Sequence, residues 1–216
     1  MSHYAVLDLE MCRVPLDEIT TPYEYEDELI QIGAILLNEK YETVDTFMTY
    51  VSAEYGSIDP FIENLTGISP DEIKDAPCCE DALNMFVNWL PEDAIIVCWS
   101  DNDEEQIKKE LAIKNIHIPA LEKYFETWTD CQRTFSKRTD ADKVYNLTEA
   151  LNIAGIVFED GAHDALVDAK NTAKIFAKMQ TEEVLILSPH YKKDDAPAHD
   201  AFNPFAALLK NYKVDQ

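Results

Sequence analysis

The sequence predicts an α/β fold in which a mixed five-stranded sheet, an antiparallel meander followed by parallel strands, is flanked by helices. Three apolar segments lie near the start of the chain, and the short polar turn 38–40 joins the second to the third. Such spacing is typical of antiparallel strands in a meander. Two later apolar segments alternate with helical patterns, which indicates parallel strands connected through helices. The five predicted strands are 5–10, 28–37, 41–51, 94–99 and 126–130.

The first strand carries two acidic residues within an apolar run (AVLDLE, residues 5–10). Side chains two positions apart on a strand point to the same face, so Asp8 and Glu10 share one space. Two carboxylates in an apolar setting repel each other and resist the loss of water, and a bound divalent cation relieves both penalties. A ligand set made of oxygen atoms favours Mg²⁺ or Mn²⁺ over zinc. The first strand therefore predicts a metal site.

The middle of the chain is predicted to alternate between helices and one central strand. Residues 59–76 form short helical pieces, interrupted at Gly67 and Pro70. Apolar residues recur at helical spacing over 79–90, which predicts an amphipathic helix. The entirely apolar run 94–99 follows, and it predicts a buried central strand.

Asp101 and Asp103 directly follow this strand, at the start of a helix predicted over 100–114. Ligand sites in open α/β sheets gather beyond the carboxyl ends of parallel strands, where either acid could reach a cation held by Asp8. Ser100 and Asp103 also fit a helix start, and acids in the first turn stabilise the helix dipole. Taken alone, this local pattern favours the capping interpretation.

The last helix is predicted over 162–180, after a short one over 146–153, and His163 lies in its first turn. Asp168 falls on the helix face that meets the sheet, where a carboxylate needs a partner. The structural alternatives are a partly exposed histidine at a helix start and a buried acid that accepts hydrogen bonds from backbone or hydroxyl groups. Neither residue, taken singly, separates a functional role from these alternatives.

Two groups of basic residues have less specific interpretations. Lys170, Lys174 and Lys178 recur at helical spacing roughly opposite Asp168, which indicates a solvated face. The densest basic stretch lies just ahead of the last helix and is either a lip that contacts phosphate or an ordinary charged loop. Its members are Arg133, Lys137, Arg138 and Lys143.

The composition restricts the class of protein. The chain of 216 residues is 46% hydrophobic and has a formal net charge of −24, which argues against tight, non-specific binding of long nucleic acid but leaves room for a local site set by metal ions. An odd number of cysteines without a Cys-x-x-Cys pair indicates free thiols and a cytoplasmic location. We find neither a secretory signal nor the ~20 consecutive apolar residues that span a membrane, so no membrane partner is expected.

The domain organisation is predicted to be simple. A single domain is expected over 1–187, since no earlier segment has the composition of a linker. The segment 188–216 begins with proline and charged residues typical of a linker. It continues into 202–212 (FNPFAALLKNY), which predicts a short helix that packs on the domain or binds a protein partner.

Taken together, these segments resemble the DEDDh 3′–5′ exonucleases, a branch of the ribonuclease-H-like superfamily, and are most similar to its Eri-type branch. The resemblance covers roughly residues 3 to 180 and rests on five short motifs in the family's order. These motifs are Asp8-x-Glu10, Ile30-Gln31-Ile32-Gly33-Ala34, Leu65-Thr66-Gly67-Ile68, Trp99-Ser100-Asp101-Asn102-Asp103 and the segment 163–173 (HDALVDAKNTA).

The resemblance implies a ribonuclease-H-like sheet and a 3′–5′ exonuclease that releases nucleoside 5′-monophosphates from single-stranded ends, with RNA or short oligonucleotides favoured. It implies two Mg²⁺ or Mn²⁺ ions, His163 as the group that takes a proton from the attacking water, and four acidic ligands. Those ligands are Asp8, Glu10, Asp103 and Asp168. The implied contacts to the terminal nucleotide are Met11 and Cys12 at the ribose and Leu65 and Thr66 at the base. Many relatives have His-Asn before the second-motif aspartate, so Asp101 stays a rival to Asp103.

Two other functions remain compatible with the sequence. One is a proofreading exonuclease subunit attached to a DNA polymerase. The other is a nuclease-like binding module without activity, which the strong acidity and the apolar segment 202–212 would suit. An intact set of ligands argues against the binding module, because buried carboxylates destabilise a fold that holds no metal.

Overall fold

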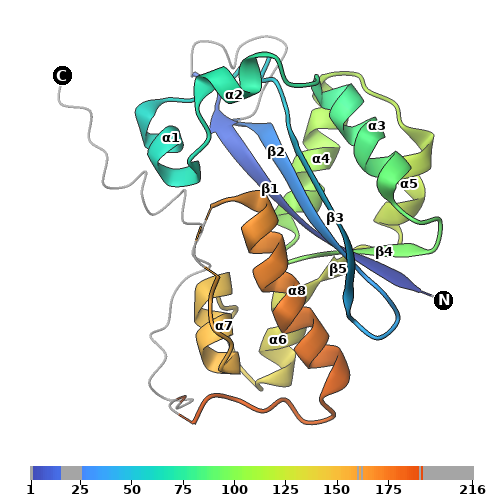
Figure 1. Cartoon of the computed structure of the whole chain (residues 1–216), viewed down its shortest axis with the longest axis vertical. Helices are drawn as coiled ribbons and strands as arrows, with labels where there is room; N and C mark the ends of the chain where they lie inside the picture. Colours follow the sequence, from blue (N-terminus) through green and yellow to red (C-terminus); the bar gives the residue numbers. More distant parts are fainter. Residues whose placement is uncertain (1, 16–25, 160, 162, 190, 192–216) are drawn as a thin grey trace.

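The computed structural model describes residues 2–15, 26–159, 161, 163–189 and 191. Its centre is a five-stranded sheet in the order β3-β2-β1-β4-β5 (Figure 1). The strands are β1 (His3–Arg13), β2 (Asp27–Leu37), β3 (Thr43–Tyr50), β4 (Ala94–Cys98) and β5 (Thr129–Asp130). The first three pair antiparallel, whereas β4 and β5 run parallel to β1. The predicted mixed sheet of meander and parallel strands is confirmed.

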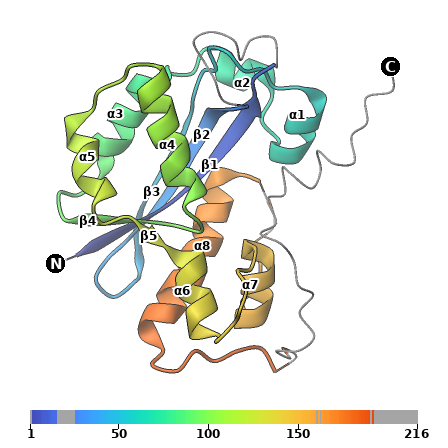
Figure 2. The same cartoon turned by 180° about the vertical axis from the view of Figure 1, so that it is seen from behind.

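Eight helices in the described part of the chain surround the sheet on both faces (Figures 1 and 2). They are α1 (Pro60–Thr66), α2 (Pro70–Lys74), α3 (Cys79–Trp89), α4 (Asn102–Ile113), α5 (Pro119–Phe125), α6 (Cys131–Arg138), α7 (Leu147–Ala154) and α8 (Ala165–Thr181).

The alternation of side chains along β1 divides the core into two layers. Ala5, Leu7 and Leu9 belong to a buried cluster that includes residues of α3, α4 and α5. Val6 belongs to the cluster on the other face, which includes residues of α6, α7 and α8. By the same alternation, Asp8 and Glu10 project toward the side of α8, so the two acids point into the layer of the last three helices.

Two helices and most of one strand differ from the sequence-based expectation. The predicted strand 126–130 is reduced to Thr129–Asp130, because Glu126 caps the end of α5 and the N–H of Thr127 still donates to the carbonyl of Tyr124 in that helix. The basic stretch expected to be a lip or loop begins as α6, whose first turn is capped by the side chain of Asp130. Both helices are only seven or eight residues long, so their apolar pattern is too short to be recognised.

Two peripheral parts of the chain, the helices α1 and α2 and the segment near residue 188, are attached to the core. A small cluster of Cys12, Ile30, Ile62, Ile68 and Ile73 fastens α1 and α2 to the end of the sheet. At the other end, the backbone N–H of Ser188 donates to the carbonyl of Ile153 at 2.7 Å, and the hydroxyls of Tyr145 and Tyr191 lie 2.9 Å apart. The segment after Ser188 therefore begins on α7, while the predicted helix 202–212 lies outside the described residues.

All five cysteines are free, and four of them are buried. Among the described helices, none combines the length and the apolar character that a membrane span requires.

Candidate metal centre

The sheet places the two acids of β1 in register with two residues of β2. Asp8 pairs with Gly33 and Glu10 pairs with Gln31, and antiparallel partners project to the same face. The register shifts immediately after Glu10, so that Met11 pairs with Leu29. Glu10 is buried, with 5% of its surface exposed, while Asp8 is partly accessible.

Gly33 allows α8 to begin directly over this part of the sheet. A Cβ atom added at Gly33 would lie 2.3 Å from the carbonyl carbon of Ala165 and 2.3 Å from the backbone nitrogen of Leu166. The first turn of α8 therefore lies against the backbone of β2, closer than any side chain would allow. This close contact brings the start of the last helix beside Asp8 and Glu10.

The segment before α8 folds so that His163 and Asp168 face one another. His163 has a left-handed backbone with a φ of 66°, and its N–H donates to Oδ2 of Asp168 at 2.9 Å. Asp164 caps the helix by accepting the N–H of Val167 at 3.0 Å. One ligand atom each from Glu10, His163 and Asp168 lies within 4.8 Å of the other two. The structure thus brings residues 10, 163 and 168 together, whereas Asp8 and Asp103, which were expected to share the same ions, lie outside this group of three.

Asp103 approaches β1 from the first turn of α4, the helix that follows β4. The last pair between β1 and β4 joins Leu7 to Cys98, so β1 continues beyond the end of β4. The N–H of Leu9 donates a hydrogen bond to the carboxylate of Asp103, which lowers the pKa of that carboxyl but less than burial raises it. Asp103 is buried, with 9% of its surface exposed, on the side of α4 that faces the sheet.

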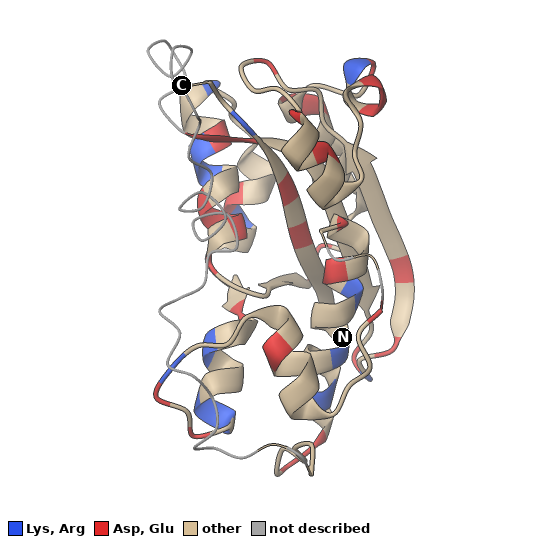
Figure 3. Ribbon diagram, turned by 90° about the vertical axis from the view of Figure 1, so that its left-hand side faces the viewer, with Lys and Arg blue, Asp and Glu red and all other residues tan. Residues whose placement is uncertain are grey.

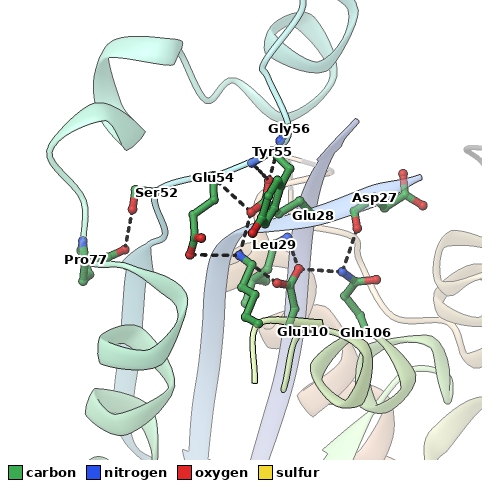
Figure 4. A network of polar contacts seen from close by, with 11 residues as sticks. Asp27, Glu28, Leu29, Ser52, Glu54, Tyr55, Gly56, Pro77, Gln106 and Glu110 are labelled. Atoms are coloured by element: carbon green, nitrogen blue, oxygen red, sulfur yellow. Dashed lines mark hydrogen bonds and ion pairs between the residues drawn. The ribbon is translucent and has the colours of Figure 1, made fainter. Parts of the chain in front are cut away.

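A buried polar network fixes α4 against β2 (Figure 4). Glu110 accepts the N–H of Leu29 at 2.8 Å and the side-chain amide of Gln106 at 2.9 Å. The ammonium group of Lys114 lies 3.0 Å from Glu110 and 2.7 Å from Glu28, both of which are fully buried. Glu28 also accepts three backbone N–H groups, from residues 54, 55 and 56. Because every charge in this network has a partner, it holds the helix that carries Asp103 in place.

Asp101 lies in a different environment from Asp103. Its carboxylate forms an ion pair of 2.6 Å with Arg133, and the two side chains are 40% and 63% exposed. Arg133 also contacts Asp130 at 3.1 Å. Asp101 is therefore engaged at the surface with α6, whereas Asp103 points inward to β1.

Electrostatic repulsion among the acids is strong. Burial raises the pKa of Asp8 well above its ordinary value, and the charges of Asp103, Glu10, Asp168 and Asp164 raise it further. The pKa of Glu10 is raised well above its ordinary value for the same reasons. Burial also raises the pKa of Asp168 and raises that of Asp103 to about 7. A divalent cation would remove this penalty, because it stabilises the ionised form of each carboxylate.

The raised pKa values predict that the metal-free protein loses stability as pH rises. Below the ordinary carboxyl values of 3.8 and 4.5, these groups are protonated in the folded and unfolded states alike. Between about pH 4 and 7 the unfolded chain releases protons that the folded protein keeps, so the free energy of unfolding falls. We expect the melting temperature in EDTA to be lower at pH 8 than at pH 5, and Mn²⁺ to raise it more at pH 8.

The control for this prediction is Asp103→Asn, which removes one of the titrating groups and should reduce the pH dependence. A metal-free melting temperature that is equal or higher at pH 8 would contradict the expectation.

The donor set of the centre suits a hard divalent cation. Glu10 and Asp168 offer oxygen ligands beside the imidazole of His163, and the carboxylates of Asp8 and Asp103 belong to the same electrostatic cluster. The carboxylates repel one another without a counter-ion, so the residues fit a cationic cofactor rather than an anionic one. Mg²⁺ and Mn²⁺ match this chemistry.

The four residues expected to contact the terminal nucleotide differ in solvent accessibility: two are partly accessible and two are buried. Met11 and Leu65 are partly accessible. The thiol of Cys12 is completely buried in the cluster under α1, so a contact to a ribose would have to involve its backbone. The hydroxyl of Thr66 donates to the carbonyl of Ile62 at 2.9 Å and accepts the N–H of Ile68, so it helps to end α1.

The structure adds two residues to those that the sequence indicates. Asp164 raises the pKa of Asp8, Glu10 and Asp168, so its carboxylate belongs to the electrostatic environment of the centre. Gln31 accepts the N–H of Ala165 at 3.0 Å and so links β2 to α8. An aspartate before a helix reads as a cap and a glutamine in a strand as a surface residue. Both lie inside motifs that carry the resemblance, but the sequence assigns no role to either.

The basic stretch has two separate roles rather than one. Arg133 contacts Asp101 and Asp130 close to the centre. Arg138 instead donates to the carbonyls of Met179, Glu182 and Glu183, and so holds the end of α8. Figure 3 shows acidic segments on most visible elements and fewer basic ones, as the net charge of −24 requires.

Comparison with known proteins places this arrangement in one family. The family model described as Exonuclease (RNase_T) matches residues 5–176. DNA polymerase III PolC-type of Caldanaerobacter subterraneus subsp. tengcongensis is 32% identical over 168 residues, a match covering 75% of this chain and 11% of that protein. The 3′-5′ exonuclease Snipper of Drosophila melanogaster is 28% identical, over 74% of this chain and 63% of its own length. ERI1 exoribonuclease 2 of Danio rerio is 29% identical, over 79% of this chain and 35% of its own length.

Solved structures share the fold. The nuclease domain of 3′hExo, described as a DEDDh family member bound to rAMP, superposes with a TM-score of 0.69 at 20% identity, covering 86% of this chain and 96% of that one. Escherichia coli exonuclease I in complex with a dT13 oligonucleotide gives a TM-score of 0.61 at 18% identity, covering 84% and 41%. These likenesses confirm the predicted ribonuclease-H-like fold. The chain spans between about a tenth and two thirds of the length of the relatives named above.

Proposed function

Because the chain belongs to the exonuclease family, we propose that it is a 3′–5′ exonuclease that hydrolyses single-stranded nucleic acid with the help of two divalent cations and releases nucleoside 5′-monophosphates. The observation that carries this proposal is the grouping of Glu10, His163 and Asp168, whose ligand atoms lie within 4.8 Å of one another, in the electrostatic field of Asp8 and Asp103. The net charge of −24 favours short oligonucleotides over long duplexes, since the average field repels polyanions. The similarity to ERI1 exoribonuclease 2 supports RNA as the substrate.

Four carboxylates are proposed to hold the ions, namely those of Asp8, Glu10, Asp103 and Asp168. Mg²⁺ or Mn²⁺, when bound there, supplies Lewis-acid stabilisation of the phosphate and makes a bound water more acidic. The chain contributes the arrangement of the ligands: strand β1 fixes two of them, and the hydrogen bond from Leu9 holds Asp103. Preorganised ligands need little rearrangement during the reaction.

His163 is proposed to accept the proton of the attacking water. An imidazole titrates near neutral pH, so its neutral form can take a proton under ordinary conditions. The left-handed backbone of His163 and the hydrogen bond from its N–H to Asp168 hold the ring beside Glu10 and Asp168. Met11 and Leu65 are the proposed side-chain contacts to the terminal nucleotide, because both are accessible at the end of the sheet.

The test is an assay of oligonucleotide shortening. Matched single-stranded RNA and DNA oligomers of several lengths, labelled at the 5′ end, are incubated with Mn²⁺ or Mg²⁺ and separately with EDTA. We expect a ladder of products shortened from the 3′ end with metal, nucleoside 5′-monophosphates in solution, and no ladder in EDTA. Products with 3′-phosphate ends, or the absence of a ladder with either metal, would refute the proposal. A faster rate on DNA would favour a proofreading role, as the similarity to a DNA polymerase suggests.

Paired substitutions should separate Asp103 from its neighbour Asp101. We expect Asp103→Asn to reduce the rate by at least about 100-fold, the usual scale for removing one preorganised electrostatic group from an active site. Asp101→Asn should leave the rate within about threefold and the free energy of unfolding within about 1 kcal/mol, because exposed ion pairs contribute little. The reverse order of effects would make Asp101 the second-motif ligand.

A further inference from the structure

Gln31 connects the two elements that carry the acids of the centre. It lies opposite Glu10 on β2, on the same face of the sheet, and its side chain is completely buried. Its Oε1 accepts a hydrogen bond of 3.0 Å from the backbone N–H of Ala165, the first residue of α8. The amide of Gln31 therefore lies between the strand that carries Glu10 and the helix that carries Asp168.

The hydrogen bond from Ala165 has a different origin from the others at the start of α8. The first four N–H groups of a helix have no partner within the helix and must find one elsewhere. Asp164 accepts the N–H of Val167, and its carbonyl accepts that of Asp168, so these two bonds are local. Gln31 supplies an acceptor from the sheet. This long-range bond fixes where the helix begins relative to β1.

The nitrogen atom of the Gln31 amide shows that packing alone does not account for a glutamine at this position. Nε2 of Gln31 is buried and has no hydrogen-bond partner within the part of the chain that the structure describes. An apolar side chain of similar length, such as methionine, would fill the same space without an unpaired donor. The acceptor bond to α8 is the interaction that an apolar side chain would lose.

Gly33 shows how close the fit is on the same strand. The backbone of Ala165 and Leu166 lies where a Cβ of Gly33 would be. The close contact at Gly33 prevents α8 from moving toward the sheet, and the bond to Gln31 prevents it from moving away. Together they restrict the distance between Glu10 on β1 and His163 and Asp168 at the start of the helix.

We propose that Gln31 is a positioning residue of the metal centre: by holding the first turn of α8, its Oε1 sets the spacing between Glu10 and the pair His163 and Asp168. This inference rests on the proposed function, because it concerns the same centre. Gln31 is completely buried and has no access to substrate. Its replacement should therefore change metal affinity and kcat, with little effect on the KM for the oligonucleotide.

The experiment compares Gln31→Met, which removes the acceptor, with Gln31→Glu, which keeps an oxygen at the same place. Mn²⁺ binding is measured by calorimetry without nucleic acid, and kcat and KM are measured with a single-stranded oligomer. We expect Gln31→Met to weaken Mn²⁺ binding about 10- to 100-fold, the usual effect of losing a group that orients metal ligands, and to lower kcat. Gln31→Glu should bind Mn²⁺ within about threefold of the parent protein, or more tightly, since its added charge attracts the cation.

Gln132→Met is the matched control. Gln132 lies on α6, and its side-chain amide donates to the carbonyl of Tyr145 at 2.7 Å instead of contacting Gln31 or Ala165. This substitution should leave Mn²⁺ binding unchanged. Gln31→Asn keeps an amide side chain, but that chain is one methylene too short for its oxygen to reach the N–H of Ala165. It should therefore weaken Mn²⁺ binding. If Gln31→Met does not fold, Gln31→Asn decides the question.

Wild-type Mn²⁺ binding in folded Gln31→Met or Gln31→Asn would overturn the inference, as would Gln31→Glu binding no better than Gln31→Met. The two proposals fail separately. A parent protein that neither binds Mn²⁺ nor shortens oligomers refutes the proposed function. A parent that does both, with Gln31→Met equal to it, refutes only the role of Gln31.

Discussion

Replacement of Asp8 by asparagine is expected to abolish hydrolysis and, at the same time, to raise the melting temperature of the metal-free protein. Asparagine has nearly the same shape as aspartate but no charge, so it removes both a proposed metal ligand and a source of repulsion. Burial and the nearby charges of Asp103, Glu10, Asp168 and Asp164 raise the pKa of Asp8 well above its ordinary value. At pH 8 the ionised carboxylate therefore opposes folding until a cation binds.

The rate should fall by at least about 1000-fold, which corresponds to about 4 kcal/mol of lost transition-state stabilisation. Melting curves at pH 8 should show a gain of several degrees in EDTA and a smaller response to added Mn²⁺ than in the parent protein. Asp81→Asn is a suitable control, because Asp81 is an exposed acid in the first turn of α3. It should leave the rate unchanged and lower stability slightly. A metal-free Asp8→Asn protein that is less stable than the parent would contradict this account.

The substitution Gly33→Ala should damage both the fold and the activity, although it adds a single methyl group. The new Cβ would lie 2.3 Å from backbone atoms of Ala165 and Leu166, whereas ordinary contact begins at 3.4 Å. Because these atoms belong to the backbone, α8 must shift as a whole. Overpacking of this kind costs about 1–3 kcal/mol in the free energy of unfolding. A displacement of about 1 Å at a reacting centre lowers the rate by about 100-fold.

Urea unfolding and kcat, each measured with saturating Mn²⁺, test this expectation. Gly155→Ala is the matched control, since Gly155 ends α7 with a φ of 66° and has open space around it apart from Ser188. That substitution should cost about 1 kcal/mol through backbone strain and leave kcat unchanged. Equal losses of kcat in the two variants would show that the activity follows general stability and not the position of α8.

Much of the sheet and half of the centre follow from local pattern. The period of two along β1 is sufficient to place Asp8 and Glu10 on one face, and the short turn after β2 is sufficient for the meander. The resemblance to the DEDDh exonucleases is confirmed at the level of the family by the match over residues 5–176. Helices α3, α4, α7 and α8 lie within one to three residues of their predicted limits at most ends.

The rest depends on contacts between residues that are distant along the chain. Asp101 and Asp103 have the same local character. Only because β4 ends beside Leu7 is the N–H of Leu9 on β1 left to donate to Asp103. Arg133 and Arg138 belong to one basic stretch in the sequence, but α6 turns one toward Asp101 and the other toward the end of α8. Local periodicity carries no information about such partners, so the sequence leaves these alternatives open.

Helix α8 is attached at both extremities, by Gln31 to its first residue and by Arg138 to the carbonyls around its last turn. A helix of 17 residues is a stiff rod of about 25 Å. Because contacts from other elements hold each end of this rod, its first turn, which carries Asp168, and its last turn form one rigid element. The acid that α8 contributes is thus held by contacts near it and by contacts about five helical turns away.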